Sequence, residues 1–204
     1  MILNTDFYFN IKHFIWVGFV KTLTVRNAST CAFVLICFCL VSCAASLSQD
    51  YERGEQAFKS ENYDEAIEYL SKYLKKSPKD ADAHLKLGLA FLKKGDLKEA
   101  VDQFKESINL NPGNSEARSL IKESIFDEAN TFFSEGKNDI GMRYLTAYLT
   151  INSDDVDTHI MLAKQFIKMG STRNAISSLN KAVELDPKNP EVVKLLDYFS
   201  DGFH

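Results

Sequence analysis

Cysteine is missing from residues 47–204, because all four cysteines lie earlier in the chain, at Cys31, Cys37, Cys39 and Cys43. This segment can therefore form neither a disulfide framework nor a thiolate metal cluster. It also lacks a cationic balance, since it holds 21 basic and 27 acidic residues, which argues against broad electrostatic binding of nucleic acid. With 45% hydrophobic and 25% charged residues, the whole composition is typical of one or two globular domains.

Charge is scarce in residues 1–46, which hold four charged side chains with a net charge of +2. Residues 29–47 hold none, and as a helix they would span about 28 Å, close to the thickness of a bilayer core. Lys21 and Arg26 precede this stretch, which places the N-terminus in the cytoplasm and the rest outside. We therefore expect residues 1–42 to be a cleaved signal segment or an uncleaved signal anchor, and residues 43–49 to be a short tether.

The end of this segment, Leu40-Val41-Ser42-Cys43, resembles the lipobox of bacterial lipoproteins. The resemblance implies that the chain is cut before Cys43 and that Cys43 is the site of lipid attachment. It also implies an extracytoplasmic location in a bacterial cell envelope. Ala44 favours the outer membrane facing the periplasm, and anchoring in the inner membrane is the alternative. A plain membrane helix with small apolar cysteines is the competing interpretation.

Short motifs recur every 34 residues in the remaining chain, as shown by Ala66 and Ala100, Pro78 and Pro112, and Gly141 and Ala175. Pro112 and Pro187 are 75 residues apart, which is two periods and seven extra residues. Each unit has the periodicity of two amphipathic helices joined by a polar turn. We therefore predict four units and a capping helix, over residues 47–80, 81–114, 122–155, 156–189 and 190–200.

This period resembles that of the tetratricopeptide repeat (TPR) family, and three sets of residues carry the match. Small residues lie midway along each first helix, at Gly54, Gly88, Ala129 and Ala163. Turn residues follow at Glu61, Gly95, Gly136 and Gly170, and small residues open each second helix at Ala66, Ala100, Gly141 and Ala175. The resemblance implies an all-α fold within residues 50–200, a right-handed α-solenoid of four helix pairs with a C-terminal capping helix.

The seven extra residues fall between Ser115 and Ile121, in a stretch without a helix breaker. Seven residues add about 10.5 Å to a helix but rotate its face by only about 20°. We therefore predict a long, protruding first helix in the third unit. Its buried stripe would comprise Ala117, Leu120, Ile121, Ile125, Ala129 and Phe132.

No group of side chains has the pattern of a catalytic or metal site, so we expect neither an enzyme nor a cofactor. His84 and His159 occupy equivalent places in two units, where we expect packing against the preceding unit. The TPR resemblance instead implies a concave groove that binds a protein or peptide, such as an amphipathic helix. The predicted groove residues are Tyr51, Glu55, Phe58, Leu85, Leu89, Leu92, Lys93, Phe126, Asn130, Phe133, Ile160, Lys164, Ile167 and Lys168.

Some TPR domains bind acidic chaperone tails through a clamp of Lys, Asn and Arg, but here the matching places hold Tyr51, Glu55, Leu85 and Leu89. Recognition of strongly acidic peptides is therefore not expected. Together these features predict a membrane-tethered adaptor or scaffold that supports assembly of an envelope complex, such as pilus, secretion or cell-wall machinery. The alternative is a non-catalytic regulatory or targeting subunit that recruits an enzyme at the membrane.

Overall fold

The computed structural model describes the backbone of residues 49–201 and the side chains of residues 49–197. Backbone contacts divide the chain into two units, Met1–Ser48 and Gln49–His204, and the described residues belong to the second. The predicted signal segment, most of the predicted tether and the predicted lipid site Cys43 lie outside the described residues. Within the described part, every helix is too short or too polar to cross a bilayer.

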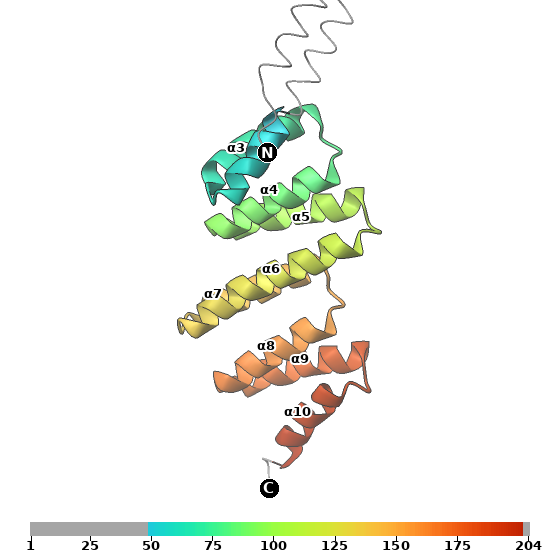
Figure 1. Ribbon diagram of the computed structural model, residues 1–204. Coiled ribbons are helices and arrows are strands. Elements are labelled where there is room, and N and C mark those ends of the chain that lie inside the picture. Colours follow the sequence, from blue (N-terminus) through green and yellow to red (C-terminus); the bar gives the residue numbers. More distant parts are fainter. Residues whose placement is uncertain (1–48, 202–204) are drawn as a thin grey trace, which may run out of the picture. The chain divides into compact units, whose positions relative to one another are not determined.

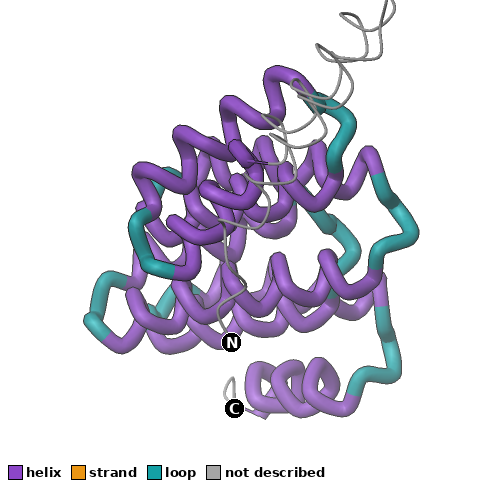
Figure 2. The backbone as a smooth tube through the Cα atoms, turned by 45° about the horizontal axis from the view of Figure 1, so that its top comes forward, coloured by secondary structure: helices purple, strands orange, loops and turns teal. Residues whose placement is uncertain are grey.

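The described chain consists of helices joined by short turns and contains no strand (Figures 1 and 2). A helix over residues 49–59 is followed by α3 (Tyr63–Lys76), α4 (Ala81–Lys94), α5 (Leu97–Leu110), α6 (Ser115–Ser134), α7 (Asn138–Leu149), α8 (Val156–Lys168), α9 (Thr172–Leu185) and α10 (Pro190–Asp201). The pairs α4–α5, α6–α7 and α8–α9 pack closely, and Figure 1 shows them as successive layers. This confirms the prediction of an all-α solenoid of helix pairs with an additional C-terminal helix.

Capping side chains set where three of the four first helices begin. Asp80, Asn114 and Asp155 precede α4, α6 and α8, and the side-chain oxygen of each accepts the backbone N–H three residues later at 2.9–3.0 Å. Such caps satisfy backbone donors that have no partner inside the helix. Because the caps recur at equivalent places, the first helix begins at the same position in each of these units.

The two repeat histidines hold these loops to the helices that come after them. The Nε2 atom of His84 lies 3.0 Å from the carbonyl oxygen of Pro78, and that of His159 lies 3.0 Å from the carbonyl oxygen of Ser153. Pro78 and Ser153 end the preceding units, so the expectation that these histidines pack against the preceding unit is confirmed.

Left-handed backbone closes the turn inside each pair. Gly95, Gly136 and Gly170 have φ angles of 90°, 74° and 70°, and Glu61 has a φ of 59° at the equivalent place in the first unit. Glycine adopts this conformation without steric cost, whereas a residue with a side chain is strained by it. The turn geometry is therefore common to all four pairs, and Glu61 adopts it at an energetic cost.

The long helix α6 has 20 residues, against 14 in α4 and 13 in α8, so the predicted extension is confirmed. Its first turns do not protrude into solvent, because Ala117 and Ile121 are buried in the main hydrophobic cluster. The prediction for Leu120 is also wrong, since this side chain is 39% exposed. Adjacent helical residues differ by about 100°, so a stripe through Ile121 turns Leu120 toward solvent.

Candidate functional site

A hollow of about 610 Å³ lies between α6, α8 and α10. Its apolar lining comes from Phe126 on α6, from Ile160, Met161 and Ile167 on α8, and from Leu195 on α10. Its polar lining comes from Asp157, Lys164, Gln165, Lys168 and Glu191. The hollow brings together five of the predicted groove residues, namely Phe126, Ile160, Lys164, Ile167 and Lys168.

The sequence of α8 explains how one helix supplies most of this lining. Positions 157, 161, 164 and 168 follow the spacing of one helical face, while Leu162 and Ala163 are buried on another. Asp155 caps the helix, and its carboxylate also accepts a hydrogen bond from the Thr158 hydroxyl at 2.7 Å. The orientation of the α8 face is therefore fixed by burial on one side and by the cap at its start.

Ion pairs border the hollow on two sides. The Lys122 ammonium on α6 lies 2.8 Å from the carboxylates of both Asp155 and Asp157, which joins α6 to the start of α8. The Lys164 ammonium on α8 lies 2.6 Å from the carboxylate of Glu191 on α10. Burial alone would lower the pKa of Lys122, but hydrogen bonds to the two aspartates outweigh it and raise this pKa, so Lys122 stays charged.

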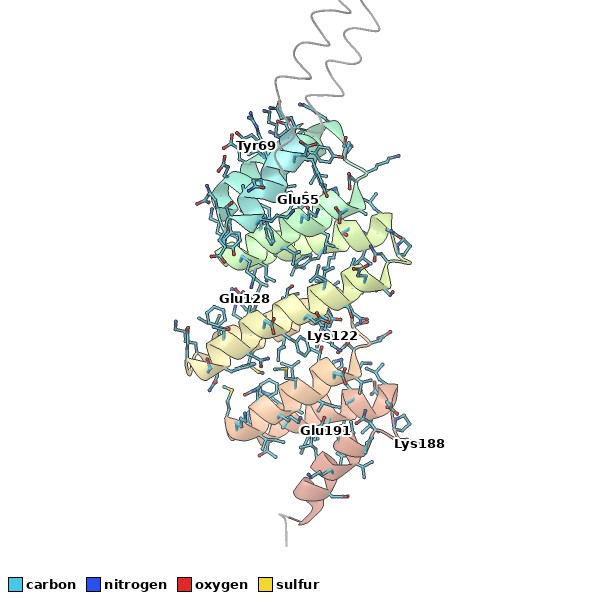
Figure 3. All side chains as sticks on the ribbon, viewed as in Figure 1. Glu55, Tyr69, Lys122, Glu128, Lys188 and Glu191 are labelled. Atoms are coloured by element: carbon cyan, nitrogen blue, oxygen red, sulfur yellow. The ribbon has the colours of Figure 1, made fainter. Side chains whose placement is uncertain are left out.

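The same kind of pair recurs along the first helices. Lys86 pairs with Glu55 at 2.8 Å, and Lys93 pairs with Glu128 at 2.7 Å. Figure 3 labels Glu55, Glu191 and two residues of α6, Lys122 and Glu128. Four lysines of this face are thus paired with carboxylates of an adjacent helix pair, loop or capping helix. By contrast, Lys168 has no carboxylate within 4.0 Å among the side chains of residues 49–197, so its charge is available at the rim of the hollow.

The N-terminal end of the predicted groove is a closed polar network rather than a hollow. Tyr51 donates a hydrogen bond to Asp82 and accepts one from Lys86 at 2.7 Å. Burial and the hydrogen bond to Asp82 raise the pKa of Tyr51 to about 12. Phe58 packs edge-on against Tyr63, with ring centroids 5.7 Å apart.

Three predicted groove residues of α4 are part of the core instead. Leu85, Leu89 and Leu92 are only 6%, 8% and 1% exposed, so the prediction that they face a partner is wrong. The reason is that α4 contacts α3, α5 and α6, which leaves little of its circumference open. Ile160 is 3% exposed and lies at the floor of the hollow, so it supports the surface rather than forming its rim.

The other predicted residues of the second and third units keep some exposure. Lys93 and Asn130 are exposed, and Phe133 is half-buried against Gly141. Sequence reasoning missed Asp157 and Met161, although both share the helical spacing of Lys164 and Lys168 and could have been found from it. It also missed Glu191 and Leu195 of α10, for which the sequence of the repeats offers no signal.

A second hollow, of about 620 Å³, lies between α5, α7 and the end of α8 and was not anticipated. Met142, Phe166 and the exposed Met169 contribute to its apolar lining. Neither hollow contains an arrangement suited to holding a metal, and no cluster of three His, Cys, Asp or Glu side chains suited to a metal occurs among the described residues.

Residues 51–115 and residues 156–189 each match a family model described as tetratricopeptide repeat. These stretches are therefore TPR repeats, which mediate protein–protein interactions by binding proteins or peptides. The matches leave out residues 116–155, where the extended α6 interrupts the 34-residue period.

Curated relatives are called "DnaJ homolog subfamily C member 3". The human protein is 30% identical over 149 residues, which is 68% of this chain and 30% of the relative. The chicken protein is 28% identical over 149 residues, which is 68% of this chain and 29% of the relative. The chain thus spans about 30% of the length of these relatives.

Solved structures with similar helix arrangements include MamA, with a TM-score of 0.40 and 20% identity over 71% of this chain and 75% of that one. They also include YrrB, described as a TPR protein with an unusual peptide-binding site, with a TM-score of 0.40 and 19% identity over 76% of each chain.

Proposed function

We propose that this chain, which contains TPR repeats, is a membrane-tethered adaptor whose concave hollow binds a partner protein. The observation that carries the proposal is the hollow itself, where an apolar floor meets Lys168, a cation without a carboxylate of its own among the described side chains. Interfaces of this kind take up apolar anchor side chains in a pocket surrounded by polar groups. A partner segment with an apolar anchor and an adjacent carboxylate matches both features.

The existing ion pairs also favour a partner segment with few acidic residues. Because Lys86, Lys93, Lys122 and Lys164 are already paired, a strongly acidic peptide would have to break several ion pairs before it gained new ones. Lys168 can pair with one carboxylate of the partner without breaking an existing ion pair. The proposed ligand is therefore an amphipathic segment in which apolar residues provide most of the buried area.

Site-specific photocrosslinking in cells tests the hollow. A benzophenone amino acid at position 168 is expected to form a defined adduct, and the same probe at position 173, exposed on α9, serves as the control. Ile167→Asp places a charge in the apolar lining and is expected to abolish the adduct at position 168. Equal crosslinking at both positions, or an adduct unchanged by Ile167→Asp, would contradict the proposal.

The tether is the second part of the proposal. The lipobox resemblance supports lipidation of Cys43 after cleavage, on the periplasmic side of an outer membrane, with an inner-membrane anchor as the alternative. Cys43→Ser is expected to prevent labelling with radioactive palmitate and to leave the precursor uncut. Cys39→Ser, four residues earlier, is the matched control and should leave both intact. Membrane retention of an uncut, unlabelled wild-type chain would support the signal anchor instead.

The adaptor would hold components of an envelope assembly, such as pilus, secretion or cell-wall machinery. The alternative is a non-catalytic subunit that targets an enzyme to the membrane, and the DnaJ homologues among its relatives favour such a link to another activity. Both functions use the same hollow and differ in the protein found in the adduct at position 168. Identification of that protein by mass spectrometry separates them.

A further inference from the structure

The C-terminal helix α10 is attached differently from the helices of the repeats. Val192 of α10 is fully buried, and it packs with Ile160 of α8 and Ala182 of α9. Leu195 and Leu196 are partly buried beside it. These three residues of α10 have i, i+3, i+4 spacing, the pattern of an amphipathic helix laid on an apolar surface. The contact is therefore a helix-docking contact within the chain.

The opposite face of α10 is open. Val193 is 45% exposed, and Lys194 and Asp197 are exposed as well. Among the described helices, α10 packs mainly against α9, whereas α9 also packs closely against α8. The pair α8–α9 thus has its own interface, which does not depend on α10. Figures 1 and 2 show α10 as a single helix beyond the last pair.

The surface under α10 is continuous with the hollow. Ile160 belongs both to the hollow and to the cluster beneath Val192, and Leu195 lines both as well. The ion pair between Lys164 and Glu191 joins the two regions, and both side chains are roughly half exposed. Departure of α10 would therefore enlarge the hollow and leave Lys164 without its carboxylate. A helix with the same pattern could restore each of these contacts.

We propose that α10 occupies a helix-docking surface from which a partner can displace it. The partner that takes its place is an amphipathic helix with the pattern Glu-Val-x-x-Leu-Leu. This proposal rests on the proposed function and specifies its ligand. The partner's acidic residue takes the place of Glu191 beside Lys164, and its apolar residues cover Ile160 and Ala182. In the resting chain α10 limits access, because a helix joined by the short loop 186–189 competes at an effective concentration on the order of millimolar.

The test uses the full chain in lipid nanodiscs and a fluorescein-labelled peptide of residues 187–201 of this chain. Val192→Asp detaches α10, and Val193→Asp adds the same charge on its exposed face as the matched control. Peptide affinity measured by fluorescence anisotropy is expected to be at least about ten-fold higher for Val192→Asp than for the wild-type chain, because intramolecular competition is removed. Val193→Asp should bind the peptide as the wild type does.

Hydrogen exchange checks that only α10 has opened. In Val192→Asp, amides of residues 190–197 should exchange faster while those of α9 stay protected. Glu191→Lys provides a variant that leaves the core intact; it should tighten peptide binding about two- to three-fold, and Lys164→Glu in the same chain should reverse the effect.

Equal peptide affinity for the wild type and Val192→Asp, or exchange that rises in α9 together with α10, overturns the proposal. Neither result affects the crosslink at position 168. Failure of the displacement proposal is therefore distinguishable from failure of the proposed function.

Discussion

The helices α4 and α5 approach each other closely at Gly88, so we expect Gly88→Ala to lower the stability of the protein. A Cβ atom at position 88 would lie 2.6 Å from two atoms of the Phe104 ring and 3.2 Å from the carbonyl oxygen of Ala100. Phe104 is fully buried, so its ring has no space into which it can move. The change Gly88→Ala therefore forces the two helices apart or strains the ring.

The expected magnitude results from two opposing effects. In an ordinary helix interior, replacing glycine by alanine stabilises by about 1 kcal/mol, because glycine loses more backbone entropy on folding. Overpacking of a well-filled core costs about 1–3 kcal/mol, and the short distances place this site toward the upper end. The net result for Gly88→Ala is a loss of about 1–2 kcal/mol in the free energy of unfolding.

Thermal unfolding of the full chain in detergent, monitored by circular dichroism, measures this effect. For a domain of about 150 residues we expect the Tm to fall by about 2–8 °C. Phe104→Ala removes both ring atoms that a Cβ at position 88 would meet, so Gly88→Ala should be neutral or stabilising when added to it. A Tm that rises in the Gly88→Ala single variant would refute the view that this contact cannot relax.

The remaining predictions concern two turns and an ion pair. Glu61→Gly should raise the Tm by about 2–4 °C, because Glu61 has a φ of 59° that glycine adopts without strain, whereas Gly170→Ala should lower it by a similar amount. Lys122→Met should cost about 0.5–1 kcal/mol by urea unfolding, and 1 M salt should diminish the difference from the wild type. Burial alone would raise the pKa of Asp155, but hydrogen bonds from Lys122 and Thr158 hold it below its usual 3.8. Its stabilisation is therefore present above that pH and is lost as the pH falls through the folded-state pKa. The loss of Tm in acid should be smaller in Lys122→Met, and an unchanged acid profile would contradict the role of this pair.

The sequence alone determined the repeat and its local geometry. The 34-residue period predicted the helix pairs, and the equivalence of Glu61 to Gly95 predicted a shared turn that their φ angles of 59° and 90° confirm. The seven extra residues predicted the length of α6. These features depend on residues close in sequence, whose backbone preferences and helical spacing can be read directly.

Only the tertiary structure decided which faces of the first helices are open. Leu85, Leu89 and Leu92 have the helical spacing of a groove, yet α4 is covered on several sides and buries them. Helical periodicity gives the direction of a side chain around its own axis, but it does not say which neighbour occupies that direction. For the same reason the hollow at α6, α8 and α10 could not be predicted in full, since Glu191 and Leu195 reach it from a helix outside the repeats. Packing between units, and not the repeat itself, thus defines the surface at which we expect a partner to bind.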